Sequence, residues 1–172
     1  VTPLQLAKAY GAIANNGLVL NPRLIKSKNI QIYESIKYEK EFKQIKNVIK
    51  KVVQNGSAKK AEIKGYTVGG KTGTAKLYIA GKQKNKYSDK NHTALFAGIT
   101  PLKNPKLSIV VVIDQPQSEI YFGGYLAAPV FKKIATDSLR ILNISPDNVM
   151  DYQKKVSQKV ENQDKFSLKN PE

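Results

Sequence analysis

The residues best suited to chemistry form a short run near the middle of the chain, Gly-Gly-Lys-Thr-Gly-Thr-Ala at positions 69–75. Lys71 brings a compact positive charge that suits an anionic group. Thr72 and Thr74 lie two apart, so their hydroxyls point to the same face of an extended chain. Gly73 has no side chain to block a ligand, and free backbone N–H groups add donors. The run predicts a cradle for a carboxylate or a developing oxyanion, although a bare Lys-Thr-Gly triplet also arises by chance.

The elements around this run are predicted to be an antiparallel sheet with helices on both faces, an α+β fold. Strand patterns cover residues 66–78, 93–100 and 107–114. The short connection between the second and third strands predicts a hairpin. Five consecutive apolar residues, 109–113, predict that the third strand is covered on both faces.

Three helices are predicted beside the sheet. The first begins with the N-cap, proline and capping-box pattern of residues 2–5 and ends at Gly17. A second, at residues 39–54, repeats apolar residues at three and four and has a Lys-rich outer face. The third is predicted to begin at Pro129 and to end near residue 143. Its inner face is predicted to be Phe131, Ile134, Ala135 and Leu142.

The sequence resembles the class B penicillin-binding proteins and, in its last blocks, their division-specific branch, the septal peptidoglycan transpeptidases. The resemblance reaches from Val1 to about Asn148, and the blocks that carry it lie in the family's order. They are residues 1–7 with 14–17, 55–58, 69–75, 96–101, 107–114, 121–131 and 142–147. The resemblance implies that residues 1–150 are the C-terminal portion of the penicillin-recognising serine transpeptidase fold, with three strands of its sheet.

The resemblance also implies the activity of the parent protein. A serine attacks a D-Ala-D-Ala stem peptide, and the amine of a second peptide resolves the acyl-enzyme into a septal cell-wall cross-link; β-lactams mimic the donor. Lys71, Thr72, Gly73 and Thr74 would bind the substrate, with Lys71 also assisting proton transfer and the Thr74 N–H as an oxyanion donor. No metal or organic cofactor is implied. The parent would act on the periplasmic side of the bacterial inner membrane, with its anchor upstream of this chain, among other cell-division proteins.

The nucleophilic serine is expected outside this chain, in the rest of the transpeptidase domain. The family order is Ser-x-x-Lys, Ser-x-Asn and Lys-Thr-Gly, with long separations. Here residues 57–60 spell the first string and residues 27–29 spell the second, so the two occur in reverse order and without the family's long separations. A nucleophilic serine also needs a base one turn away at the start of a buried helix, whereas Ser57 follows a helix end at Gly56. We interpret both strings as chance matches and predict that the chain alone is inactive.

The charge bears on the alternatives. Lys and Arg number 29 against 13 Asp and Glu, a net charge of +16, and the tail 151–172, predicted to be a disordered basic segment, carries little of it. A nucleic-acid-binding domain gathers such charge on one element; here the Lys residues are spread along the chain, so nucleic acid is not predicted as a partner. We interpret the excess positive charge first as lysines on solvated faces of the domain, and second as a means of attraction to the anionic cell wall. The main alternative to the enzyme is a catalytically inactive penicillin-fold scaffold or sensor, and a basic nucleic-acid-binding domain is a second alternative that ranks below it.

Two further features have competing interpretations. The basic segment 81–91 beside the predicted site could steer a substrate, but a solvated hairpin tip is favoured. His92 is the only histidine and the chain has no cysteine, which excludes a zinc site of the usual kind. Aromatic residues at 121, 122 and 125 could line the cleft, although core and loop packing is favoured.

Overall fold

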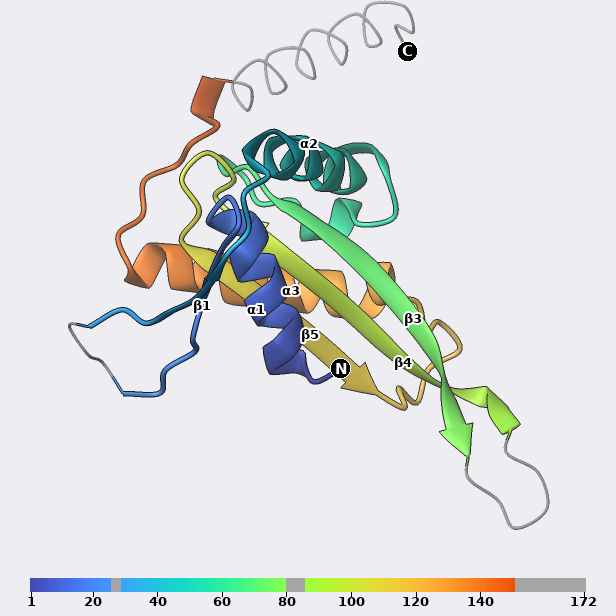
Figure 1. Cartoon of the computed structure of the whole chain (residues 1–172). Coiled ribbons are helices and arrows are strands. Elements are labelled where there is room, and N and C mark those ends of the chain that lie inside the picture. Colours follow the sequence, from blue (N-terminus) through green and yellow to red (C-terminus); the bar gives the residue numbers. More distant parts are fainter. Residues whose placement is uncertain (26–28, 80–85, 151–172) are drawn as a thin grey trace, which may run out of the picture.

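A three-stranded antiparallel sheet forms the centre of the fold (Figure 1). In the computed structural model, which describes residues 1–25, 29–79 and 86–150, the strands lie in the order β3 (Gly69–Ile79), β4 (Lys86–Thr100) and β5 (Leu107–Asp114). The predicted β4–β5 hairpin is confirmed by their antiparallel register. Since β4 is central, β3 and β5 each have an outer edge that no described strand pairs.

Helices cover both faces of this sheet, which confirms the predicted α+β architecture. Helix α1 (Pro3–Ala14) lies in front of β4 and β5 in Figure 1, and α3 (Gly123–Ile141) lies behind them. Helix α2 (Glu39–Asn55) packs across the beginning of β3. The remaining elements are the paired strands β1 (Leu18–Leu20) and β2 (Ile32–Ser35) and the 3-10 turn η1 (Lys59–Ala61). None of the described helices combines the length and apolar character needed to cross a bilayer.

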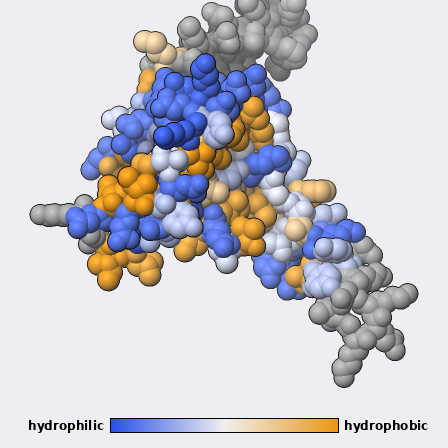
Figure 2. Space-filling view, in the orientation of Figure 1, coloured by the Kyte–Doolittle hydropathy of each residue, from blue (hydrophilic) through white to orange (hydrophobic). Residues whose placement is uncertain are grey.

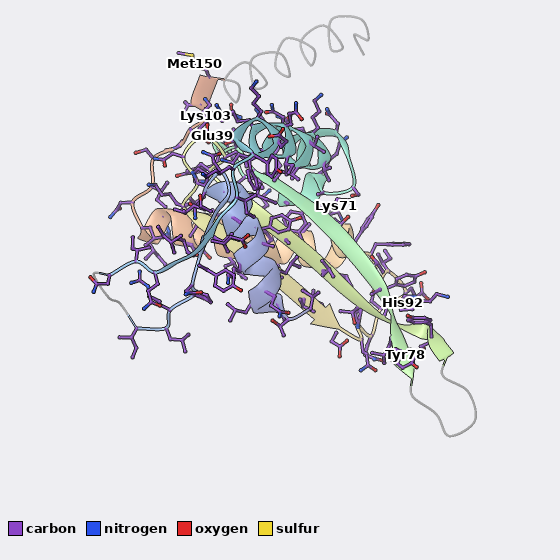
Figure 3. All side chains as sticks on the ribbon, viewed as in Figure 1. Glu39, Lys71, Tyr78, His92, Lys103 and Met150 are labelled. Carbon is purple, nitrogen blue, oxygen red and sulfur yellow. The ribbon has the colours of Figure 1, made fainter. Side chains whose placement is uncertain are left out.

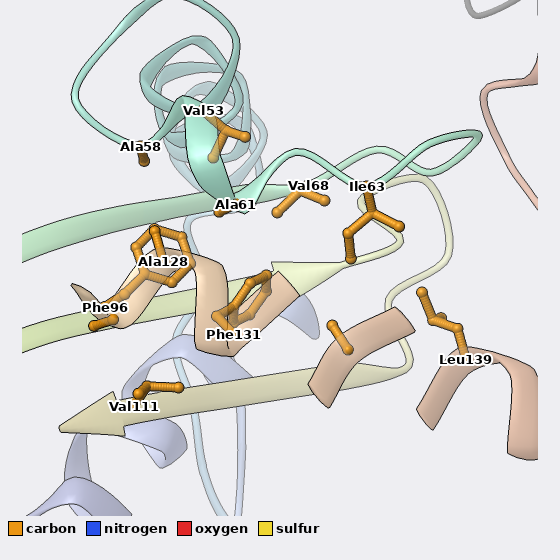
Figure 4. Packing of buried hydrophobic residues seen from close by; sticks show 12 residues of the cluster. Val53, Ala58, Ala61, Ile63, Val68, Phe96, Val111, Ala128, Phe131 and Leu139 are labelled. Atoms are coloured by element: carbon orange, nitrogen blue, oxygen red, sulfur yellow. The ribbon is translucent and has the colours of Figure 1, made fainter. Parts of the chain in front are cut away.

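The larger core lies between the sheet and α3 (Figure 4). Phe96 of β4 and Phe131 of α3 are fully buried and meet edge to face, with ring centroids 4.7 Å apart. Alanines at 127, 128 and 135 let the helix approach the strands closely. At the end of the sheet where β3 begins, α2, η1 and the turn between them close this core with Val53, Ala61 and Ala58.

Helix α3 differs from its prediction at both its start and its inner face. It begins at Gly123, six residues before Pro129, which lies inside the helix. The buried stripe is Phe131, Ala135 and Leu139, whereas Ile134 and Leu142 are 44% and 57% exposed. The proline was predicted at the first helical position because that is its commonest helical setting. With the earlier start, a stripe repeating every four residues faces the sheet.

The strand boundaries also differ from the prediction. β3 begins at Gly69, three residues late, and β4 begins at Lys86, seven residues early. Residues 86–91 of the predicted loop therefore belong to β4. Residues 80–85 of that loop, the predicted tail 151–172, and Ser27 with Lys28 lie outside the described residues.

Candidate active-site wall

The Lys-Thr-Gly-Thr run lies on β3, an outer strand of the sheet, as Figure 3 shows for Lys71. The side chains of Thr72 and Thr74 both lie toward the first residues of α3. Thr72 contacts Ser57, whose backbone packs against Gly124. Thr74 accepts a hydrogen bond from the backbone N–H of Gly123. Lys71 is exposed, and its ammonium donates to the carbonyl oxygen of Thr72 at 3.0 Å. The strand therefore carries a cation and two hydroxyls within four consecutive residues.

The N-terminus of α3 adds to the positive potential around these hydroxyls. The backbone N–H of Gly123 donates to Thr74 Oγ1 at 3.3 Å. This close approach requires glycine, because a Cβ at Gly123 would meet the carbonyl oxygens of Leu95 and Gly73 at 2.3 and 2.6 Å. A helix N-terminus carries about half a positive elementary charge. An anionic group held by Lys71 and Thr74 would gain from that field.

Ser57 is also brought to this strand, which the sequence reasoning did not predict. Its hydroxyl and that of Thr72 lie 2.9 Å apart. The lysine that completes the Ser-x-x-Lys string does not reach back to it, because the Lys60 ammonium lies 4.0 Å from the centroid of the Tyr125 ring. Across the described ranges, the only recorded hydrogen-bond partner of the Ser57 side chain is Thr72. The geometry fits a hydroxyl that supports the strand rather than a nucleophile with its base.

Asp147 fixes the backbone that leads into β3. Its carboxylate accepts hydrogen bonds from both the backbone N–H of Thr67, at 2.6 Å, and the Thr67 hydroxyl. The same hydroxyl accepts from Leu102 N–H at 2.8 Å, and the carbonyl oxygen of Thr67 accepts from Thr100 Oγ1 at 3.0 Å. Thr67 is almost fully buried, so all of these groups need partners. Sequence reasoning assigned Asp147 no role, since no local pattern links residues so far apart.

Aromatic side chains lie at the other end of the run. His92 is buried, and its ring stacks on that of Tyr121 with centroids 3.8 Å apart. Tyr121 in turn contacts Phe122, which is half exposed and directly precedes α3. His92 therefore packs as an aromatic residue, and within the described part of the chain no three His, Cys, Asp or Glu side chains gather to hold a metal.

Residues 1–136 match the family model described as the penicillin binding protein transpeptidase domain. The chain belongs to this family. The match contains the whole sheet, α1, α2 and most of α3. The strand bearing Lys71, its hairpin partners and the helix N-terminus beside Thr74 are thus all part of the transpeptidase domain.

Curated relatives and solved structures agree with the transpeptidase assignment. Over 154 residues the chain is 41% identical to the peptidoglycan D,D-transpeptidase FtsI of Buchnera aphidicola, covering 87% of this chain and 26% of the relative. It is 38% identical over 144 residues to the probable peptidoglycan D,D-transpeptidase PenA of Neisseria gonorrhoeae, covering 83% and 24%. The transpeptidase domain of Burkholderia pseudomallei penicillin-binding protein 3 superposes with a TM-score of 0.73 at 33% identity, covering 86% of this chain and 44% of that one. The chain thus spans about a quarter of the length of these curated relatives.

Proposed function

We propose that this chain is the C-terminal part of a septal-type peptidoglycan D,D-transpeptidase domain and supplies one wall of its active site. The observation that carries the proposal is the placement of Lys71, Thr72 and Thr74 along an outer strand, beside the N-terminus of α3. The parent would act on peptidoglycan at the periplasmic side of the inner membrane, together with other division proteins, and would be a target of β-lactams.

In the complete enzyme, a serine from outside these 172 residues would attack the carbonyl carbon of the penultimate D-Ala. The peptide bond to the terminal D-Ala breaks, and that residue leaves as an amine after receiving a proton. The amine of a second stem peptide then attacks the ester, so an amide forms and the serine regains its proton. Two partial reactions of this kind replace one difficult step.

The residues of this chain would bind and orient the donor peptide. The Lys71 ammonium attracts the terminal carboxylate, and the hydroxyls of Thr72 and Thr74 donate hydrogen bonds to it. The backbone N–H of Thr74 would be one of two donors to the developing oxyanion, a type of contact that contributes strongly to acyl transfer. Ser57 would hold Thr72 from behind rather than react.

Labelling with a fluorescent penicillin tests this proposal. After prolonged exposure of the 172-residue chain to the penicillin, intact-protein mass spectrometry should show no covalent adduct. A separate activity assay should show no carboxypeptidase activity. Both results are expected because the chain lacks the nucleophile and its base. The complete protein that contains this sequence should form a stoichiometric adduct at a serine outside it. An adduct mapped to Ser57, or an unlabelled complete protein, would overturn the proposal.

A further inference from the structure

A hollow lies between α2 and the loop that joins β4 to β5. It has a volume of about 310 Å³, near the lower end of the roughly 300–1,000 Å³ typical of small-ligand sites. Figure 2 shows strongly hydrophilic side chains gathered over α2, at the top of the view. Four of the seven lining residues are lysines, and no acidic side chain lines the hollow among the described residues. The lining is Lys43, Lys46, Asn47, Lys50, Thr67, Leu102 and Lys103.

The spacing of residues on α2 explains why these lysines converge. Lys43, Lys46 and Lys50 are separated by three and four residues, so they share one face of the helix. Phe42 and Ile49 occupy the buried face and fix the rotation of the helix. Lys103 approaches from the β4–β5 loop, on the other side of the hollow.

Two of the four ammonium groups are partly used by the fold, and two are not. Lys46 donates to the carbonyl oxygen of Ala14 at 2.9 Å and to Asn16 Oδ1 at 2.7 Å. Lys103 donates to the carbonyl oxygen of Asp147 at 2.8 Å. For the ammonium groups of Lys43 and Lys50, no hydrogen bond or ion pair to a residue in the described ranges is found. Since each ammonium has three N–H donors, several remain available around one hollow.

The positive charges of this hollow are not balanced by any acidic residue within its described lining. Burial, and then the neighbouring Lys43, lower the pKa of Lys46. The carboxylate of Asp147 lies beside Lys103, but it already accepts hydrogen bonds from Thr67 and from the backbone N–H of Lys103. Glu39 lies one turn before Lys43 on α2 and outside the lining. A bound anion would relieve the repulsion between the lysines.

We infer that this hollow binds a phosphate-bearing anion, either a lipid headgroup or a free phosphate compound. A phosphate offers several strong acceptor oxygens in different directions, which suits point charges arriving from two sides of a cavity. A carboxylate offers acceptor oxygens in fewer directions than a phosphate does. The inference does not depend on the proposed transpeptidase activity, because the residues of the Lys-Thr-Gly-Thr run do not line the hollow.

Pyrophosphate and lipid vesicles are the probes that test this site. Binding of pyrophosphate to the 172-residue chain is measured by calorimetry at moderate salt, and flotation is measured with phosphatidylglycerol and with neutral phosphatidylcholine vesicles. Lys43→Gln with Lys50→Gln should weaken binding about tenfold or more, the effect of losing charge-assisted hydrogen bonds. The matched control, Lys132→Gln with Lys133→Gln on α3, removes the same charge from exposed lysines elsewhere and should change binding by less than about twofold.

The outcomes distinguish a free phosphate compound from a lipid headgroup, and some of them would overturn the inference. Binding of pyrophosphate without flotation assigns a free phosphate compound, and flotation with phosphatidylglycerol vesicles assigns a headgroup. In the wild-type chain, amide NMR shifts caused by pyrophosphate should map to α2 and residue 103, which checks the site without any variant. Equal losses in the two double variants, shifts spread over α3, or binding of neither probe would overturn the inference.

Discussion

Lys71 is the residue whose role in the proposed enzyme is easiest to measure. Its ammonium is exposed and contacts only the neighbouring carbonyl oxygen among the described residues, so it is available to a ligand. In the complete protein, Lys71→Ala removes a charge-assisted hydrogen bond of roughly 1.5–3 kcal/mol, which corresponds to about a ten- to hundredfold loss in acylation by labelled penicillin. Lys106→Ala, an exposed lysine before β5, is the control. Acylation of Lys71→Ala within twofold of wild type would show that Lys71 does not face the ligand.

Ser57 allows a second test at the residue scale. A neutral hydrogen bond such as that to Thr72 contributes roughly 0.5–1.5 kcal/mol, so Ser57→Ala in the complete protein should lower acylation by less than about tenfold. Removal of a nucleophile would instead abolish adduct formation. The rate of labelling by penicillin distinguishes these outcomes, and a complete loss of labelling would identify Ser57 as reactive.

Among the larger elements, the beginning of β3 depends on a hydrogen-bond network centred on Thr67. Asp147→Ala leaves the buried N–H and hydroxyl of Thr67 without their acceptor, and the free energy of unfolding should fall by about 1–3 kcal/mol. Asp137→Ala is the matched control, because its ion pair with Arg140 is exposed and should matter by less than about 1 kcal/mol. Urea unfolding of the 172-residue chain measures both. Equal, small losses would mean that the network does not hold the strand.

The packing of α1 against the sheet predicts a response to alkaline pH. Burial raises the pKa of Tyr10 above its ordinary value of 10.0. Its contribution to stability is therefore complete below about pH 10 and is lost as pH rises through the raised value, because the unfolded chain releases the phenol proton first. Relative to Tyr10→Phe, the wild-type chain should keep its full unfolding free energy up to about pH 10 and lose part of it above that pH. The lowered pKa of Lys46 acts in both proteins and cancels; a difference independent of pH would contradict the prediction.

Local patterns in the sequence predicted the elements well and the contacts between distant elements poorly. The capping box of α1 is present, with Thr2 N–H donating to Gln5 Oε1 at 2.8 Å and Gln5 N–H to Thr2 Oγ1 at 3.2 Å. The early start of α3 depends on glycines that fit against two strands, and no local pattern encodes that fit. The same holds for Asp147, 80 residues from Thr67. The lysines that line the hollow come from separate parts of the sequence, and they converge only because α2 packs beside the β4–β5 loop.

At the scale of the whole molecule, the central sheet has two outer edges, those of β3 and β5, that no described strand pairs. Exposed edges present unpaired N–H and C=O groups that invite pairing with another chain. The 172-residue chain should therefore be marginally stable or associate with itself as its concentration rises. Sedimentation velocity over a range of concentrations, combined with thermal melts, measures this. A highly stable and strictly monomeric chain would contradict the prediction.

The contact between Thr67 and Asp147 has a consequence for the order in which a ribosome-bound chain can fold. The two residues are 80 positions apart, so at about 5–20 residues per second the partner of Thr67 is synthesised roughly 4–16 s later. Until then, the backbone before Gly69 lacks the carboxylate that anchors it. The hairpins can form as they emerge, whereas the final position of the strand that carries Lys71 waits for a segment made after α3. Nascent-chain proteolysis would therefore find this strand among the last parts of the domain to become protected.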